Sequence, residues 1–314
     1  MAFLKPQDIK ILYMGTPAMS ASILEALVAN GFSLVGVVCQ EDKEIGRDKT
    51  AEIVPTKKVA LAHAIPVFQP HKIRLDFAFA KTLDFDVIVT MAYGQIIPQG
   101  LLDLAKVGSL NLHGSLLPKY RGAAPIQRAI MAGEKETGVT LMEMVAAMDA
   151  GKMYDKASFP LLDSDNYTSV CAKISSAATQ LIVKDLLPYA NKEIAGEEQK
   201  EKDVTIANKI KPEDERLPLS LSVNDAWNYV RGLSEEPGAY LLLNGKKLKI
   251  YAAHVENGAV IRSVGEMIPN KKKLLVQYYD GQLSLDVVQL EGKKKMDAAS
   301  FLNGAHLSDH VLFK

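Results

Sequence analysis

The stretch IKILYMGTPAMSASILEALVANGFSLVGVVCQ, residues 9–40, decides the fold class of this chain. Residues 9–15 form a short apolar run that ends in glycine, and residues 33–40 form a second apolar run, as buried strands do. Between the two runs, apolar residues recur at helical spacing as far as Gly31, a residue type that commonly ends helices. This strand–helix–strand order predicts a parallel sheet with right-handed crossovers.

The same alternation continues as far as residue 190, and we predict a Rossmann-like α/β domain over residues 1–190. The turn after the first strand, MGTPAMS, lacks the G-x-G-x-x-G pattern, and the chain contains no P-loop, so a dinucleotide site is not favoured. The further predicted strands are 65–69, 84–94, 107–114 and 137–145, and the further predicted helices are 53–64, 124–134 and 166–192.

The character of the sequence changes after residue 190. Residues 191–207 begin with the charged, turn-rich run NKEIAGEEQKEKD, which predicts a linker. Within residues 208–314 a helix is predicted at VNDAWNYVRGL, and the short alternating runs that follow are separated by the hairpin signals NGKK and YDGQ. Such a pattern is typical of a small β-barrel or sandwich, and we favour an OB-like barrel.

Composition limits the function classes. Of the 314 residues 48% are apolar, enough for a large core, and 37 basic residues balance 37 acidic ones. Any contact with nucleic acid therefore has to come from local patches. Cys39 and Cys171 form no C-x-x-C pair, which favours free thiols in a reducing cytoplasm. No apolar run reaches the ~18 residues of a membrane span, and the beginning MAFLKPQDIK does not resemble a signal peptide.

The residues able to do chemistry concentrate at the end of the fifth predicted strand, in LNLHGSLLPKYRGAAPIQ, residues 110–127. Asn111 and His113 are two positions apart, so on a strand their side chains point to the same side. A strand that is buried on both faces rarely carries two polar side chains on one of them. Gly114 then permits a sharp turn and Pro118 fixes the exit of the loop, which predicts a rigid site.

Asp149, in VAAMDAGKMY, follows another predicted strand and completes an Asn–His–Asp set if the strand ends meet. The set contains no covalent nucleophile, and the chain has no G-x-S-x-G elbow. We therefore expect direct transfer of a small acyl group between two bound molecules. In such a reaction an amide donates to the oxyanion of a tetrahedral intermediate, and imidazole and carboxylate move a proton. The spacing of His and Cys predicts no metal site.

These motifs resemble those of the 10-formyltetrahydrofolate-dependent formyltransferases. The segments that carry the resemblance are MGTPAMSASILEAL, VFQP, AYGQIIP, NLHGSLLPKYRGAAPIQ, ETGVTLMEM and MDAGKM, together with a carboxy-terminal β domain. The resemblance covers essentially the whole chain, and it is greatest to the members that act on initiator methionyl-tRNA. Glycinamide ribonucleotide formyltransferase shares the Asn, His and Asp, but it is a single shorter domain and lacks the RGAAPIQ continuation.

The resemblance implies roles for individual residues. Asn111, His113 and Asp149 are expected to be catalytic, in the transfer of a formyl group from N10 of 10-formyltetrahydrofolate to the free α-amino group of initiator methionyl-tRNA for translation initiation. We expect a cytoplasmic monomer that needs no metal and no membrane. Folate is expected to contact Tyr93, Gly94, Gln95, Ile96, Ile97, Ser115, Leu116, Leu117 and Pro118, and tRNA to contact Arg47, Lys119, Arg121 and the carboxy-terminal domain.

Three segments depart from the family pattern in regions expected to join the domains or to meet tRNA. The loop 41–50 reads EDKEIGRDKT and is acidic as well as basic, residues 217–220 read LPLS, and residues 234–239 read SEEPGA. The β domain nevertheless offers a lysine stripe for phosphates. Its members are Lys246, Lys247, Lys249, Lys271, Lys272, Lys273, Lys293, Lys294 and Lys295.

Three other functions remain compatible with the sequence. An amino-sugar formyltransferase would use a nucleotide sugar in place of tRNA, although the lysine-rich β domain argues against it. A formyltetrahydrofolate hydrolase would use the same Asn–His–Asp set to release formate with water. A non-catalytic RNA-binding module would require a degenerate site, which the intact set disfavours.

Overall fold

The computed structural model describes residues 3–45, 50–270, 272–305, 307–308 and 311–314. The chain forms two compact units that are not continuous in sequence. The first consists of Met1–Gly122, Thr137–Phe159 and Cys171–Ile206, and the second of Ala123–Glu136, Pro160–Val170 and Ala207–Lys314. The predicted linker thus groups largely with the first unit. The domain limits drawn from the sequence stay a prediction.

The first unit is built on a sheet that has seven strands among the described residues, in the order β5–β2–β1–β6–β7–β8–β9. From β5 to β7 neighbouring strands are parallel, which confirms the predicted Rossmann-like core. The strands are β1 (Lys10–Gly15), β2 (Ser33–Val38), β5 (Val67–Phe68), β6 (Val87–Met91), β7 (Gly108–His113), β8 (Glu136–Glu143) and β9 (Met153–Pro160).

The sheet is not parallel throughout, which corrects the expectation from the sequence. β8 runs antiparallel to β7, with Thr140 opposite His113 and Met142 opposite Asn111. The reason is that the chain after β7 turns back without crossing over the sheet. β9 follows as the edge strand and has no counterpart among the predicted elements. A separate hairpin of β3 (Lys43–Ile45) and β4 (Thr50–Glu52) was also not predicted.

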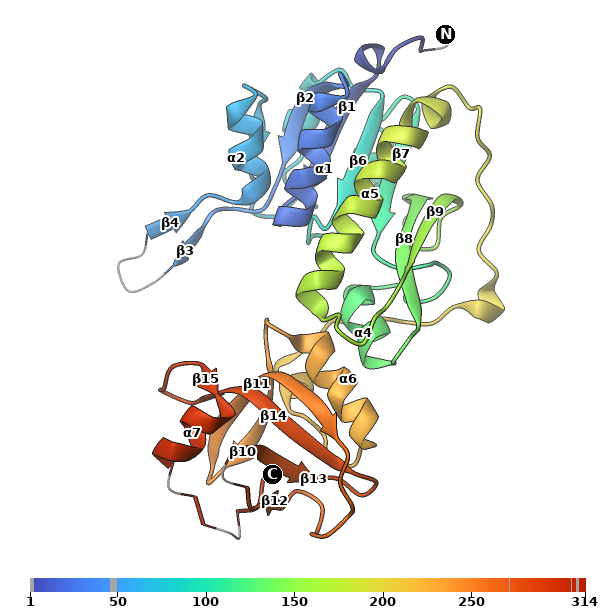
Figure 1. Cartoon of the computed structure of the whole chain (residues 1–314). Helices are drawn as coiled ribbons and strands as arrows, with labels where there is room; N and C mark the ends of the chain where they lie inside the picture. The colour runs from blue at the N-terminus through green and yellow to red at the C-terminus, as the bar shows by residue number, and fades with distance from the viewer. Residues whose placement is uncertain (1–2, 46–49, 271, 306, 309–310) are drawn as a thin grey trace. The chain divides into compact units, whose positions relative to one another are not determined.

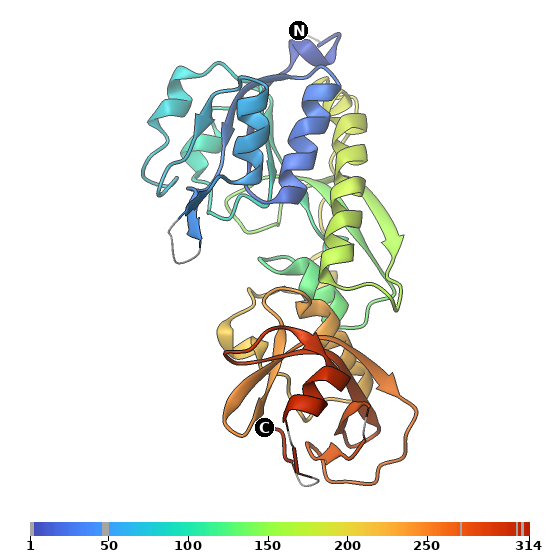
Figure 2. The ribbon, with the colours of Figure 1, turned by 60° about the vertical axis from the view of Figure 1, so that its left-hand side comes forward.

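Helices cover both faces of this sheet. Figures 1 and 2 show α1 (Ala18–Ala29), α2 (Pro55–Ala62) and α5 (Tyr167–Ala190) over one face. The core on the opposite side joins Leu12, Met14 and Ile88 of the strands to buried residues of η2 (Ala78–Thr82) and α3 (Gln99–Leu102). Because β1, β6 and β7 are parallel, their carboxyl ends meet at one edge of the sheet, where ligands of such folds bind.

The second unit contains an antiparallel sheet in the order β10–β11–β14–β13–β12, with β15 paired to β14. Two helices of this unit, α4 and α6, pack against each other. Its elements are α4 (Pro125–Met131), η4 (Pro212–Glu215), α6 (Val223–Leu233), β10 (Ala239–Leu243), β11 (Lys246–Glu256), β12 (Met267–Ile268), β13 (Leu274–Gln277), β14 (Gln282–Leu290), β15 (Met296–Asp297) and α7 (Ala298–Ala305). The short helices η1 (Pro6–Asp8) and η3 (Glu201–Asp203) belong to the first unit.

The last residues of the chain join the two edges of this sheet. Leu242 of β10 exchanges backbone hydrogen bonds with Lys314, at 2.7 and 3.1 Å. On the other side, Met267 of β12 donates its N–H to the carbonyl of Val311, and Phe313 donates to the carbonyl of Gly265, both at 2.8 Å. Residues 311–314 therefore connect β10 to β12, and the sheet forms the half-barrel that was predicted as a small barrel.

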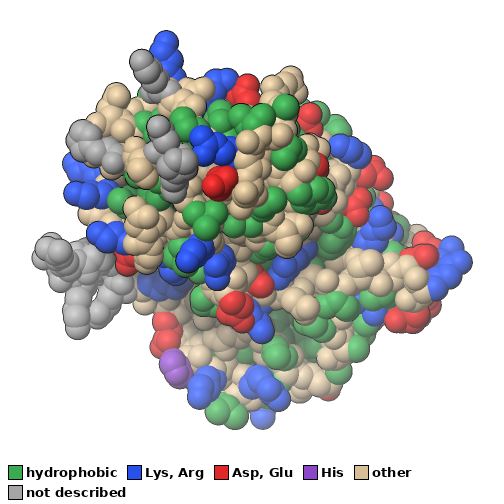
Figure 3. Space-filling model, turned by 90° about the horizontal axis from the view of Figure 1, so that it is seen from below, with side chains coloured by type: hydrophobic (Ala, Val, Ile, Leu, Met, Phe, Trp, Pro, Cys, Tyr) green, Lys and Arg blue, Asp and Glu red, His purple; other side chains and the backbone are tan. Residues whose placement is uncertain are grey.

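The surface carries both signs of charge. Figure 3 shows acidic and basic side chains interspersed on one face of the molecule, in keeping with the balance of 37 acidic and 37 basic residues. Within the part of the chain that the structure describes, none of the helices combines the length and the apolar character needed to cross a membrane.

Phe313 tests the closure of the half-barrel. Its side chain is 1% exposed and belongs to the core of the second unit, so Phe313→Ala should cost about 3 to 5 kcal/mol of unfolding free energy. The neighbouring Leu312 is 47% exposed, and Leu312→Ala serves as the matched control with little expected loss. Urea unfolding of the full chain measures both, and equal losses would contradict the closing role of Phe313.

A pair of carboxyl groups lies between β9 and α5. Asp185 is buried beside Asp155, and burial together with this neighbour raises the pKa of Asp185 to about 6. Lys184 forms ion pairs with both carboxyl groups. An acid whose pKa is raised on folding binds its proton more tightly in the folded state. Its contribution to stability is therefore greatest at acidic pH and falls as the pH rises from the unfolded value of 3.8 through about 6.

The variant Asp185→Asn should remove this pH-dependent loss. We expect its unfolding free energy relative to the parent chain to be higher at pH 8 than at pH 4 by about 1 to 3 kcal/mol. Thermal melts of both proteins at the two pH values measure the difference. Asp76→Asn, on an exposed loop, is the control and should show no such difference. A pH-independent effect of Asp185→Asn would contradict the raised pKa.

Candidate active site

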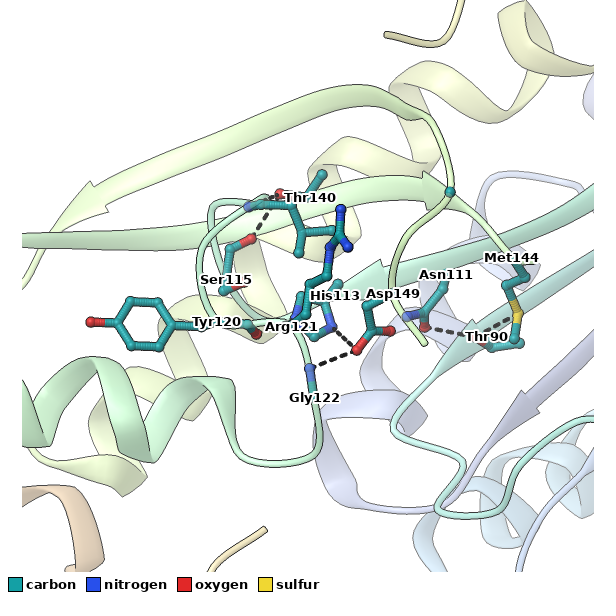
Figure 4. A network of polar contacts seen from close by, with 12 residues as sticks. Thr90, Asn111, His113, Ser115, Tyr120, Arg121, Gly122, Thr140, Met144 and Asp149 are labelled. Carbon is teal, nitrogen blue, oxygen red and sulfur yellow. Dashed lines mark hydrogen bonds and ion pairs between the residues drawn. The ribbon is translucent and has the colours of Figure 1, made fainter. Parts of the chain in front are cut away.

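The three residues predicted to be catalytic come together at the carboxyl end of β7. The Nδ1 atom of His113 lies 3.7 Å from Oδ2 of Asp149, although the two residues belong to a strand and to a loop after the next strand. Asn111 lies on the same side of β7 as His113, and Figure 4 shows all three side chains in one group. Both members of the pair are largely buried, so little solvent screens them.

The imidazole of His113 is oriented by a backbone carbonyl. Its Nε2 atom lies 2.9 Å from the oxygen of Tyr120. A carbonyl only accepts hydrogen bonds, so Nε2 has to carry a proton and donate it. In the neutral ring the other nitrogen, Nδ1, is then an acceptor that faces the carboxylate of Asp149. A proton that arrives between them can be held by both groups.

Asp149 is held in an unusual backbone conformation. Its φ is +50°, in the left-handed region that few residues other than glycine adopt and that aspartate and asparagine tolerate better than most. The carboxylate oxygen Oδ2 accepts a 2.8 Å hydrogen bond from the N–H of Gly122, and the backbone carbonyl accepts one of 2.7 Å from Nε2 of Gln199. The side chain is thereby fixed toward His113.

Asn111 has its amide group oriented by β6. The hydroxyl of Thr90 lies 2.7 Å from Oδ1 of Asn111 and 3.5 Å from the sulfur of Met144. Because Thr90 donates to the amide oxygen, the NH₂ group of Asn111 turns away from Thr90, and Figure 4 shows it on the side of His113 and Asp149. The site thus combines an amide donor, an imidazole acceptor and a carboxylate.

The loop Ser115–Pro118, expected to contact folate, is mainly packed against the protein. Ser115 is fully buried and donates from Oγ to the carbonyl of Lys119 at 2.7 Å. Thr140 of β8 joins the loop at both ends, because its hydroxyl donates to the carbonyl of Ser115 and accepts from the N–H of Leu117. Leu117 is buried as well, whereas Leu116 and Pro118 are half-buried. These contacts fix the shape of the loop.

The second expected folate segment, Tyr93–Ile97, is fixed to the turns that follow β1 and β2. The carbonyl of Tyr93 accepts hydrogen bonds from Oγ1 of Thr16 and Nε2 of Gln40, at 3.2 and 3.0 Å. Gln95 accepts from the N–H of Ile73 at 2.8 Å. The ring of Tyr93 is buried, and burial raises its pKa above the usual range. Gly94 is exposed with φ at +91°, Ile96 is 73% exposed and Ile97 is half-buried, so the segment presents backbone and apolar surface.

The three residues expected to contact tRNA differ in position. Arg47 lies outside the described residues. Lys119 is exposed at the end of the site loop. Arg121 is buried, and its guanidinium already donates to Gln199 and to Glu201 at 2.9 Å. It is therefore placed to support the loop 120–122, and its contact with tRNA stays a prediction.

The expected lysine stripe is partly engaged with the protein itself. Lys249 donates to the carbonyl of Pro237, Lys273 pairs with Glu256 and Lys295 pairs with Glu235. The ammonium of Lys247 lies 4.4 Å from the ring centre of Tyr240. Lys271 lies outside the described residues. The stripe stays a prediction for RNA contact.

Sequence reasoning missed several residues of this site. Thr90, Thr140 and Gln199 supply hydrogen bonds to the site, and the sequence alone predicted a role for none of them. Thr140 lies within the segment ETGVTLMEM, whereas Thr90 and Gln199 stand in no motif that was singled out. Thr90 precedes the AYGQIIP segment on β6 and Thr140 lies within β8, so a polar residue in an apolar strand was the available signal. Gln199 lies in the charged run NKEIAGEEQKEKD, which predicts a linker, so no local pattern distinguished it.

Considered as chemistry, the site can stabilise an oxyanion and accept a proton beside it. No cluster of three or more His, Cys, Asp or Glu side chains suited to a metal ion occurs in the described ranges. A half-buried amide donor next to an acid–base pair suits acyl transfer to an amine.

Comparison with known proteins defines the class first. Residues 8–186 match the family model described as formyl transferase, and residues 209–306 match the formyl transferase carboxy-terminal domain. These matches cover more than half of the chain, and together with the fold and the Asn–His–Asp group they make it an enzyme of the formyl transferase class. The resemblance stated from the sequence motifs is thereby confirmed.

The relatives specify the family further. The methionyl-tRNA formyltransferase of Streptococcus thermophilus is 43% identical over 299 residues, which cover 94% of this chain and 95% of the relative. That of Streptococcus equi subsp. zooepidemicus is 42% identical over the same shares of the two chains. The chain belongs to the methionyl-tRNA formyltransferase family.

A solved structure shows the same fold at low identity. The N-formyltransferase from Helicobacter canadensis, in complex with folinic acid and dTDP-3-aminofucose, superposes with a TM-score of 0.69 at 18% identity. The superposition covers 88% of this chain and 98% of that one.

Thr90 provides a test of the orientation of Asn111. Thr90→Val keeps the size of the side chain but removes the hydroxyl that donates to Oδ1, so the amide can rotate and its NH₂ group loses its fixed direction. We expect kcat to fall at least about tenfold, as for a misplaced transition-state donor. Thr90→Ser retains the hydroxyl and should keep most of the activity. Equal kcat for the two variants would contradict this role.

Proposed function

We propose that this enzyme transfers the formyl group of 10-formyltetrahydrofolate to the free α-amino group of initiator methionyl-tRNA. The single observation that carries the proposal is the contact of 3.7 Å between His113 and Asp149, next to the oriented amide of Asn111. The names of relatives at 42 to 43% identity over 94% of the chain support the choice of tRNA as the acceptor.

The first step is attack of the neutral amine on the formyl carbon. A carbon–nitrogen bond forms, and the formyl oxygen becomes an oxyanion in a tetrahedral intermediate. The NH₂ group of Asn111, with its direction fixed by Thr90, donates to this oxygen. The largely buried position of the site strengthens this interaction relative to water.

The second step moves one proton and breaks one bond. The attacking nitrogen loses a proton to Nδ1 of His113, which is the free acceptor because Nε2 donates to Tyr120. Asp149 lies against the imidazolium that forms and stabilises its charge. The bond from the formyl carbon to N10 of folate then breaks as N10 takes the proton from the imidazolium, so the neutral imidazole is restored and the intermediate collapses to the formylated amine and tetrahydrofolate. None of the three residues forms a covalent bond to the formyl group during the reaction.

Two loops are proposed to hold the donor. The segment Tyr93–Ile97 offers the flat pterin a rigid backbone edge beside the exposed side chain of Ile96, since Gln40 and Thr16 fix the carbonyl of Tyr93. Because Ser115 and Leu117 are buried, we assign them to shaping the loop, and we assign folate contact to Leu116 and Pro118. On the acceptor side Lys119 and the lysines of the second unit are proposed to meet phosphates.

Two alternatives are decided by the acceptor. The structure from Helicobacter canadensis contains an amino-sugar nucleotide, but its 18% identity to this chain supports only a common fold. The hydrolase would pass the formyl group to water. The choice is made by supplying labelled 10-formyltetrahydrofolate with methionyl-tRNA, with a nucleotide amino sugar, or with neither.

We expect the labelled formyl group to appear in methionyl-tRNA and not in the amino sugar or in free formate. We also expect the transfer to depend on His113 and Asp149. His113→Ala and Asp149→Asn should each lower it at least roughly 100-fold, because each removes one acid–base group. Asn at position 149 can still accept the hydrogen bond from Gly122, so its loss of activity reports the charge. Formate release without an amine, or transfer to the amino sugar only, would refute the tRNA assignment.

A further inference from the structure

Residues 197–206, part of the predicted linker, form hydrogen bonds to both loops of the site, and we call them the bridging segment. Glu197 exchanges two backbone hydrogen bonds of 2.8 Å with Met153, next to the Asp149 loop. At the other end, Ile206 forms a parallel bridge with Arg121, on the loop that follows His113. The segment therefore connects the loop that carries Asp149 with the loop that follows His113.

Gln199 is the contact of the bridging segment with Asp149. Its side chain is largely buried, and Nε2 donates to the carbonyls of Asp149 at 2.7 Å and Gly151 at 2.8 Å. Its Oε1 accepts from Nε of Arg121 at 2.9 Å. One amide group thus uses both of its hydrogens on the Asp149 turn and its oxygen on the opposite loop.

Thr205 is the corresponding contact with the His113 side. Its Oγ1 accepts from the N–H of Tyr120 at 2.8 Å, and its carbonyl accepts from the N–H of Arg121 at 2.9 Å. Tyr120 is the residue whose carbonyl accepts from Nε2 of His113. Thr205 therefore holds the residue whose carbonyl determines which nitrogen of the His113 ring is free to act as a base.

Both turns that the bridging segment holds are in the left-handed backbone region. The φ angles of Tyr120 and Asp149 are +62° and +50°. A residue other than glycine adopts this backbone conformation at a cost in free energy, and the conformation persists only where the surrounding structure fixes it. At Tyr120 the fixing bond comes from Thr205, and at Asp149 it comes from Gln199.

We propose that the bridging segment positions the catalytic pair, with Gln199 and Thr205 as positioning residues for Asp149 and His113. Gln199 sets the direction of the Asp149 carboxylate, and Thr205 sets the carbonyl that orients the imidazole. This inference rests on the proposed roles of His113 and Asp149. The segment belongs to the first unit and continues at Ala207 into the second.

The experiment uses the full chain and the transfer of formyl from 10-formyltetrahydrofolate to methionyl-tRNA. Gln199→Leu removes the donors and the acceptor, and Gln199→Glu keeps an acceptor for Arg121 but removes the donors to the Asp149 turn. Both should lower kcat at least about tenfold with KM for the folate nearly unchanged. Glu198→Gln, whose side chain in the same segment is 76% exposed, is the matched control and should retain kcat.

Substitution of Thr205 tests the positioning of His113. Thr205 is exposed, so Thr205→Val is expected to fold while losing the oxygen that accepts from Tyr120. We expect kcat to fall about tenfold for Thr205→Val and to be restored in Thr205→Ser, because serine retains the hydroxyl. Thermal melts of all variants identify any that owe their loss to unfolding.

Combination with Asp149→Asn separates positioning from a general structural effect. If Gln199 acts through Asp149, Gln199→Leu should cause little further loss of kcat in the Asp149→Asn background. Losses that multiply would overturn the proposal, as would wild-type kcat in Gln199→Leu and Thr205→Val. If His113→Ala and Asp149→Asn themselves retain activity, the proposed roles of the pair fail instead. If the parent chain does not formylate methionyl-tRNA, the proposed function fails, so these failures are distinguished from that of the positioning role.

Discussion

The hydrogen bond from Nε2 of His113 to the carbonyl of Tyr120 is the constraint on which the proposed chemistry of this enzyme depends. It settles which nitrogen of the ring carries the proton, and it leaves Nδ1 as an acceptor 3.7 Å from the carboxylate of Asp149. Without it the ring can rotate or change tautomer, and the pair no longer presents a base to an attacking amine. The remaining contacts of the site keep His113, the carbonyl of Tyr120 and Asp149 in these relative positions.

This arrangement is possible because the parallel strands β6 and β7 end on the same side of the sheet, where β6 supplies Thr90 and β7 supplies Asn111 and His113. The loop after the antiparallel β8 brings Asp149 to within 3.7 Å of His113. The antiparallel β8 contributes Thr140, which holds the loop after His113 at both of its ends. A site composed from strand ends is rigid because each side chain is anchored in a hydrogen-bonded sheet.

The segment between the two units changes how the domain organisation is understood. A charged stretch between domains is usually a spacer, yet residues 197–206 form hydrogen bonds to the loops of Tyr120 and Asp149. The segment and both loops belong to the first unit, and the chain enters the second unit at Ala207. In the second unit, residues 311–314 act in a similar way when they connect β10 to β12.

The sequence by itself determined the Rossmann-like core, the β character of the second half and the polar pair on β7, because each follows from a short period in the chain. Alternation by two places Asn111 and His113 on one side of a strand, whatever surrounds it. The tertiary structure alone decided the antiparallel β8, the burial of Ser115 and Leu117, and the support from Gln199 and Thr205. These contacts join residues 50 and 85 positions apart, as from Gln199 to Asp149 and from Tyr120 to Thr205. No local period marks such pairs, since they exist only once the chain has closed on itself.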